Sequence, residues 1–338
     1  MNGSTRRATR APTTHGVLIC SYQRPADLLA CLAALSGQRR RPDDVLVVAR
    51  DSDGATLDAL RARRPDGLPL RVLTVAAPGK VFALNAGLDA CRTDVLTIAD
   101  DDTVARPDWL ERIFEHFAAD PALGGLGGRD RCHDGEAFDD RRQDVVGKLQ
   151  WFGRTIGNHH LGCGGPREVD FLKGANMSYR AEAFAALRFD TRLRGRGAQP
   201  HEDLAFSLAV RRAGWKLLYD PAVLIEHYVG RRAEPRYYVG GTKLTDSSGF
   251  FDNCFNNAVA LWDALPPARR VAYAAWVLLV GTRVLPGLVQ AARLTPGEGV
   301  GAWRKMLLCQ RAHFAAYARL LLRPGQEPAG GHRGGASP

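Results

Sequence analysis

Residues 95–102 of the chain read VLTIADDD. Val95–Ala99 is a short apolar run that predicts a buried strand, and Asp100, Asp101 and Asp102 follow directly after it. Three adjacent carboxylates repel one another, so a cation or solvent must compensate for their charge. Mg²⁺ is typically bound by one or two carboxylates together with phosphate oxygens. The triplet therefore indicates a metal–diphosphate site, although the commoner structure for such a sequence is a solvated turn.

Strands and helices alternate on the N-terminal side of this stretch. Pro25 stands where a helix would begin, and leucines recur after it at helical spacing. Such repeats predict an α/β fold with a parallel sheet covered by helices on both faces. Ligands bind beyond the carboxyl ends of such strands, where Ser21–Arg24, Arg50–Asp53 and Asp100–Asp102 fall. The other predicted strands are Val17–Cys20, Val45–Ala49 and Leu70–Val75.

The second half of the chain has a different pattern. Residues 124–168 contain many glycines and no clear periodicity, which predicts a mobile loop region. Val169–Leu172 then reads as a strand, Glu202–Arg212 as a helix, and Trp215–Tyr219 as the approach to another strand. Glu202 and Asp203 open that helix, where the helix dipole favours acidic residues in any protein. A carboxylate facing a metal-bound electrophile can instead serve as a general base.

Basic residues are concentrated in the two ends of the chain. The chain has 338 residues and a formal charge of +10, and no paired cysteine spacing typical of a zinc finger occurs among its seven cysteines. We expect a disordered leader at 1–14, a helical segment at 236–323 and a disordered tail at 324–338. Val271–Val280 is apolar but shorter than the roughly 20 residues of a membrane span, so insertion of residues 271–292 in a membrane is a less favoured alternative. Trp303–Arg323 predicts a basic amphipathic helix, which suits an anionic membrane surface, packing on the domain or packing on a second subunit.

The order of the motifs between residues 15 and 230 resembles that of the family 2 inverting glycosyltransferases, which have the GT-A fold. The resemblance covers about two-thirds of the chain and implies a domain at 15–235 with a Rossmann-like, mixed and mainly parallel sheet flanked by helices. The C-terminal helical appendage lies outside it. The matching pieces are Cys20–Pro25, Lys80 with Ala83–Gly87, Asp100–Asp102, Gly174–Arg180, Glu202-Asp203, Arg211 with Ala213–Trp215, and His227.

The resemblance also implies a role for each matching residue. Asp203 would be the general base, and Asp102, Asp100 and His227 would bind Mn²⁺ or Mg²⁺. The sequence departs from the family at residues 49–53, ARDSD, where relatives often have an acidic pair before Gly-Ser, so Arg50 or Asp51 would contact the base. The donor site would comprise Ser21, Tyr22, Arg24, Asp51, Lys80, Asn85, Asp100 and Asp101, and the acceptor and sugar pocket Trp151, Gly174, Asn176 and Glu202.

These roles imply an enzyme that transfers a sugar from a nucleotide-diphosphate donor, with a UDP-sugar favoured, to an acceptor hydroxyl. The acceptor class stays open between a glycan, a lipid-linked molecule and a small molecule. The expected location is the cytoplasm, including the inner face of the cell membrane. A sugar-1-phosphate nucleotidyltransferase is less favoured because Ser21–Pro25 contains no glycine. A degenerate module that binds membranes or nucleic acid is a further alternative, although the near-neutral central region argues against nucleic acid.

Overall fold

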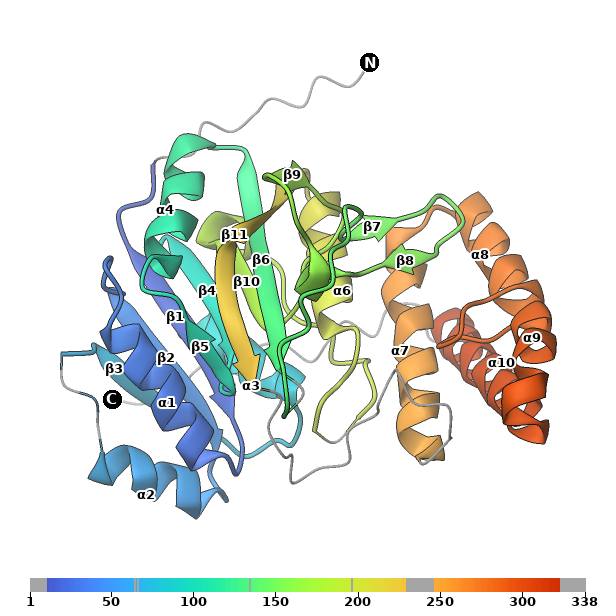
Figure 1. Ribbon diagram of the computed structural model, residues 1–338, viewed down its shortest axis with the longest axis horizontal. Coiled ribbons are helices and arrows are strands. Elements are labelled where there is room, and N and C mark those ends of the chain that lie inside the picture. Colours follow the sequence, from blue (N-terminus) through green and yellow to red (C-terminus); the bar gives the residue numbers. More distant parts are fainter. Residues whose placement is uncertain are drawn as a thin grey trace, which may run out of the picture.

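The structure is a computed structural model that describes residues 11–228 and 246–322, apart from residues 64, 66, 134 and 196. Within these residues a mixed sheet forms the centre of the molecule, in the order β3-β2-β1-β4-β10-β6-β11-β5, and β9 pairs with β11 (Figure 1). The strands of this sheet are β1 His15–Ser21, β2 Asp44–Arg50, β3 Leu70–Val75, β4 Val95–Asp100, β5 Thr103–Ala105, β6 Leu123–His133, β9 Arg167–Glu168, β10 Asn176–Arg180 and β11 Lys216–Tyr228.

The N-terminal half of the sheet is parallel, as the sequence predicts. β1 pairs with β2 and with β4, and β2 pairs with β3, all in parallel register. Alternate side chains of β1 enter two different cores, because Val17 and Ile19 pack on one face of the sheet and Leu18 on the other. The connecting helices are α1 Pro25–Ser36, α2 Gly54–Ala62, α3 Lys80–Asp89 and α4 Trp109–Ala119.

The C-terminal half corrects one prediction. Residues 124–168 are not a continuous loop region, because β6 occupies the first part of that segment and pairs with both β10 and β11. Its glycines are required by close packing: a Cβ at Gly124 would lie 2.3 Å from Trp215 Cβ, and one at Gly125 would lie 2.7 Å from Leu217 Cδ2. The rest of the segment holds β7 Lys148–Leu149, β8 Thr155–Ile156, the short 3₁₀ helix His159–Leu161 and β9.

The predicted strand at Val169–Leu172 is also wrong. Its apolar side chains are buried, which explains the strand-like pattern, but its backbone makes no strand ladder. The Val169 amide donates to the Leu217 carbonyl oxygen, and the Leu172 amide donates to Ser207 Oγ at 3.0 Å. The apolar pattern of Val169–Leu172 therefore predicts correctly that the segment is buried, but it does not predict its backbone conformation.

The helices of the second half are α5 Ala181–Phe184, α6 Glu202–Arg212, α7 Ser247–Ala264, α8 Pro267–Leu279, α9 Leu288–Glu298 and α10 Val300–Leu322. α6 has the bounds that the sequence predicts, and the last four form the expected helical region beside the sheet (Figure 1). α7 packs against both α6 and α10. Among the helices of the described ranges, none is long and apolar enough to cross a membrane.

The predicted chain ends fall mostly outside the described residues. This applies to residues 1–10, to the domain boundary at 235/236 and to the tail at 324–338. The leader predicted at 1–14 extends too far, because Thr13 and Thr14 are both bound to the sheet domain. Their amides donate to Asp94 Oδ2 at 2.7 Å and 3.0 Å. The ordered domain therefore begins before β1.

Candidate active site

The aspartate triplet lies at the carboxyl end of β4 and is neutralised mainly by cationic side chains. Arg24, which stands just before α1, forms ion pairs with Asp101 and with Asp102, the second at 2.6 Å. Ser21 Oγ, at the end of β1, donates to Asp101 Oδ2 at 2.7 Å. Burial raises the pKa of Asp101 to about 7, although Arg24 and Ser21 oppose the shift. The triplet is therefore a buried, paired cluster and not a solvated turn.

Lys80 joins the triplet to the start of α6. It is the first residue of α3, after Gly79, whose φ of +112° is a conformation that side-chain-bearing residues rarely adopt. Its Nζ lies 2.8 Å from Asp100 Oδ1 and 3.2 Å from Glu202 Oε1. Burial raises the pKa of Glu202 to about 7, although Lys80 lowers it in part. One lysine thus bridges two acidic groups that are far apart in the sequence.

Asp100, Asp102 and His227 converge as a group that can hold a cation. One ligand atom from each lies within 4.8 Å of the others, and His227 Nε2 lies 3.1 Å from Asp102 Oδ1. Two carboxylates and an imidazole form a donor set that suits Mn²⁺, and the carboxylates also suit Mg²⁺. Burial acts to lower the pKa of His227, but ion pairs with Asp102 and Asp130 outweigh it and raise the pKa to about 11.

Asp130 and Lys173 complete the surroundings of His227, and the sequence analysis did not identify either residue. Asp130 lies in β6 and is fully buried, and its Oδ2 lies 3.5 Å from His227 Nδ1. Lys173 forms an ion pair with the same carboxylate. Burial acts to raise the pKa of Asp130, but Lys173 and His227 outweigh it and hold the pKa well below its usual range. His227 is therefore held between two carboxylates, one on each ring nitrogen.

Asp203 lies at the first turn of α6, next to Gly174. Its Oδ2 accepts a hydrogen bond from the Gly174 amide at 2.9 Å, and its Oδ1 accepts one from the Leu204 amide at 2.7 Å. A Cβ at Gly174 would stand 3.5 Å from Lys80 Nζ and 3.7 Å from Asp203 Oδ2. Gly174 therefore stands between the lysine of the acidic cluster and the carboxylate predicted to be the base.

The loop before α6 is held by two amide side chains that the sequence analysis missed. Gln199 Oε1 accepts from the Val81 amide at 2.9 Å, and Gln199 Nε2 donates to the Leu193 carbonyl oxygen at 2.9 Å. Asn256, in α7, accepts from the Arg194 amide at 2.7 Å and donates to the Pro200 carbonyl oxygen at 3.0 Å. The loop that leads to Asp203 is thus fixed to α3 on one side and to α7 on the other.

Tyr22 and Asp51, two predicted donor contacts, lie at the carboxyl ends of β1 and β2. The Arg50 guanidinium lies 5.4 Å from the centre of the Tyr22 ring. Asp53 supports this edge, because its Oδ2 accepts from the Gln23 amide at 2.6 Å and its Oδ1 from the Thr56 amide at 3.2 Å. This buried aspartate fixes the β1–α1 loop and starts α2.

Three other predicted residues use their polar groups elsewhere. Asn85 exchanges hydrogen bonds of 2.9 Å and 2.7 Å with the backbone of Phe189. Asn176 is buried, accepts from Trp109 Nε1 and donates to the carbonyl oxygen of Val223. Trp151 is 68% exposed, beyond β7, and its carbonyl oxygen accepts a hydrogen bond from Arg269. Their predicted contacts with donor and acceptor stay predictions.

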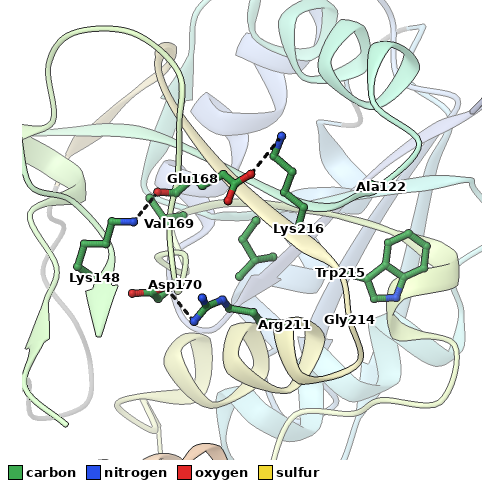
Figure 2. A pocket seen from close by; sticks show the side chains of 10 residues that line it. Ala122, Lys148, Glu168, Val169, Asp170, Arg211, Gly214, Trp215 and Lys216 are labelled. Carbon is green, nitrogen blue, oxygen red and sulfur yellow. Dashed lines mark hydrogen bonds and ion pairs between the residues drawn. The ribbon is translucent and has the colours of Figure 1, made fainter. Parts of the chain in front are cut away.

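A separate hollow of about 550 Å³ lies beside the start of β11 (Figure 2). Its charged groups are paired with one another: Arg211 lies 2.9 Å from Asp170, and Lys216 lies 3.4 Å from Glu168. It adjoins the C-terminal end of α6, whereas Asp203 stands at the N-terminal end. We assign it no part in the candidate active site.

The comparisons with known proteins agree with this arrangement. A family model described as "Glycosyltransferase like family 2" matches residues 12–240. The amylovoran biosynthesis glycosyltransferase AmsE of Erwinia amylovora is 30% identical over 110 residues, which cover 32% of this chain and 41% of that protein. The chain therefore matches less than half of that relative's length.

Solved structures share the fold at low sequence identity. The mannosyltransferase PcManGT of Pyrobaculum calidifontis, in complex with GDP-Man and Mn²⁺, has a TM-score of 0.55 at 18% identity, covering 93% of this chain and 88% of its own. S. aureus TarS 1-349, in complex with UDP-GlcNAc, has a TM-score of 0.54 at 16% identity, with coverages of 91% and 92%. GalNAc-T7 with UDP, GalNAc and Mn²⁺ has a TM-score of 0.58 at 13% identity, with coverages of 75% and 48%.

Proposed function

The chain belongs to the glycosyltransferase-like family 2, and on that basis we propose that it is a metal-dependent, inverting glycosyltransferase. Its mixed, mainly parallel sheet with flanking helices is the expected GT-A fold. The observation that carries the proposal is the placement of Asp203 beside the acidic cluster, to which Lys80 connects the start of α6. Neither alternative weighed on the sequence, a nucleotidyltransferase or a non-catalytic binding module, is favoured by any contact described above.

The donor in this proposal is a nucleotide-diphosphate sugar bound at the carboxyl ends of β1, β2 and β4. Asp102, Asp100 and His227 would hold Mn²⁺ or Mg²⁺, which supplies Lewis-acid neutralisation of the diphosphate leaving group. Arg24 and Lys80 add fixed positive charge at the same edge. Ser21, Tyr22 and Asp51 would contact the nucleoside. We favour UDP as the nucleotide; two of the similar structures contain UDP or a UDP-sugar and a third contains GDP-Man.

The reaction in this proposal is a single displacement with Asp203 as base. The acceptor oxygen forms a bond to the anomeric carbon on the face opposite the diphosphate, while the bond to the diphosphate oxygen breaks. Asp203 takes the hydroxyl proton, and the leaving diphosphate keeps the electron pair. The Gly174 and Leu204 amides hold the carboxylate in place for this step. Glu202, ion-paired with Lys80, would orient the acceptor or the loop.

The acceptor in this proposal is a hydroxyl of a glycan, a lipid-linked molecule or a small molecule. The residues predicted on its side are Trp151, Gly174, Asn176 and Glu202. Of these, Gly174 donates its amide to Asp203. Peripheral contact of the chain with an anionic membrane also belongs to the proposal, because it would bring the site to lipid-linked acceptors.

Calorimetric titration with UDP, GDP, TDP and CDP tests the donor site. Each is titrated with Mn²⁺ and with EDTA, for the natural chain, for Asp102→Asn and for Asp58→Asn as a control on exposed α2. We expect metal-dependent binding of one nucleotide that is lost in Asp102→Asn and kept in Asp58→Asn. If the folded protein binds none of the four, the proposed donor site is wrong.

A further inference from the structure

The last helix, α10, packs one face against the rest of the protein. The buried residues of that face recur at helical spacing, and most are small or apolar, which lets α7 and α9 lie close to them. Its one buried lysine, Lys305, is paired with Glu298 at 2.8 Å. The inner face comprises Ala302, Lys305, Met306, Cys309, Ala312, His313 and Ala316.

The opposite face of α10 presents an apolar line to the solvent. Val300, Leu307, Phe314 and Leu321 are spaced seven residues apart, and their exposures are 75%, 58%, 76% and 63%. Seven residues make about two helical turns, so these four side chains follow one line along the helix. Trp303, 38% exposed, extends the same face. We call these five residues the outer stripe.

Positive charge borders the outer stripe. Arg304 and Arg311 are exposed and again seven residues apart. At about 100° per residue they lie roughly 60–80° around the helix from Phe314. Across residues 266–322 the sequence has eight arginines and lysines and a single acidic residue, Glu298. Because Glu298 is paired with buried Lys305, its carboxylate does not offset the arginines beside the stripe.

We propose that the outer stripe docks on an anionic lipid bilayer. Apolar side chains flanked by arginines match the boundary between acyl chains and headgroups, where tryptophan is also favoured. Two copies of α10 packed stripe to stripe would bring Arg304 and Arg311 near their counterparts, with no acidic residue in α10 to pair with them. Anionic headgroups supply that missing charge. The proposal specifies the membrane contact named above and does not depend on sugar transfer.

Sedimentation with lipid vesicles tests this surface on the full chain. The vesicles contain phosphatidylcholine alone or mixed with phosphatidylglycerol, and carry no acceptor. The variants are Leu307→Ser with Phe314→Ser, and Arg304→Gln with Arg311→Gln. The controls are Val72→Ser, at an exposed valine of β3, and Arg61→Gln, at an exposed arginine of α2. Thermal unfolding confirms that each variant folds, and analytical ultracentrifugation gives its oligomeric state.

We expect the natural chain and both controls to bind only the anionic vesicles. The double serine variant should lose this binding, and the double glutamine variant should bind about 25-fold more weakly, since each arginine near a charged surface contributes about a fivefold factor. Equal binding by every variant would overturn the proposal, as would no binding by the natural chain. A natural chain that dimerises through Phe314, with no lipid binding, would assign the stripe to a second copy instead. A failed donor titration would leave these outcomes unaffected.

Discussion

Asp203 is oriented by two backbone amides, and an Asn side chain keeps its shape and one of these two hydrogen bonds. We predict that Asp203→Asn binds the nucleoside diphosphate as the natural chain does and transfers sugar about 10²–10⁴-fold more slowly, because the acceptor proton loses its base. Calorimetry and a product assay measure the two effects separately. Loss of nucleotide binding in this variant would place Asp203 in the donor site.

Asp130 gives a second prediction at the scale of single residues. Because its carboxylate faces His227 Nδ1, Asp130→Asn should loosen the ring and weaken Mn²⁺ binding about 10–100-fold. Electron paramagnetic resonance of free Mn²⁺ measures the affinity without any substrate. Asp58→Asn, at an exposed aspartate of α2, is the control and should bind as the natural chain does. Unchanged Mn²⁺ affinity in Asp130→Asn would mean that the carboxylate serves stability alone.

The sequence indicates which residues gather at the site when they follow strands with strong patterns. The triplet comes after a buried β-branched run, and the structure pairs it with Ser21, Arg24 and Lys80. Asp130 and Lys173 were missed because the first stands in a glycine-rich segment and the second in an irregular one. Their contacts form only when β6, β11 and the segment that contains Lys173 come together in the fold. A local sequence pattern does not predict such long-range contacts.

The glycines of β6 allow a prediction at the scale of elements. A Cβ at Gly128 would lie 1.8 Å from the Val223 carbonyl oxygen and 2.4 Å from Asn176 Nδ2. Gly128→Ala should therefore destabilise the fold by about 3 kcal/mol or more, since neither atom can move freely. Denaturant unfolding measures the loss. Gly54→Ala is the control, because nothing lies within 4 Å of a Cβ at that position. A comparable loss of stability in the control would show that steric overlap is not the cause.

The same glycines explain why sequence patterns predicted β1, β2 and β4 but not β6. A strand is visible in a sequence when side chains alternate or form an apolar run. In Leu123–Gly128 four of six residues have no side chain, and the apolar groups that fill the space come from partners such as Trp215 and Leu217. Val169–Leu172 shows the reverse error, with buried side chains and no strand pairing.

Asn256 links the helical region to the base-bearing loop. We predict that Asn256→Ala slows transfer more than it weakens nucleotide binding, because Arg194 and Pro200, in the loop before Asp203, lose their backbone hydrogen bonds to this side chain. The expected cost in stability is about 1–3 kcal/mol for the unpaired backbone groups. Steady-state kinetics against donor and acceptor separates the effects. If the transfer rate and the nucleotide affinity fell by the same factor, or if neither changed, Asn256 would have no positioning role.

At the scale of the whole molecule, two buried histidines should each lower the stability of the fold in mild acid. Burial, with a smaller contribution from Arg40, lowers the pKa of His15 to about 3, and burial lowers the pKa of His159 to about 4. Unfolded histidines titrate near 6.5, so the unfolded chain binds more protons as the pH falls from about 6.5 toward 4. The contribution of these two histidines to stability is therefore full above that range and declines through it, whereas the raised pKa values of Asp101 and Glu202 act in the opposite direction. Urea unfolding at several pH values measures how the free energy of unfolding changes with pH. His15→Gln should make this free energy less sensitive to acid. An unchanged dependence on pH would mean that His15 is protonated in the folded protein.

The hydrogen bonds between α7 and the loop before Asp203 also bear on how such a protein can be recombined. The family match ends at residue 240, before α7 begins at Ser247. A chimera joined at that limit would keep the proposed nucleotide site, but a helix from another protein would lie beside Pro200. The shortest segment that can be exchanged with its activity should therefore extend through Ala264. A chimera that takes less of this chain should fold and bind the nucleotide but transfer little sugar.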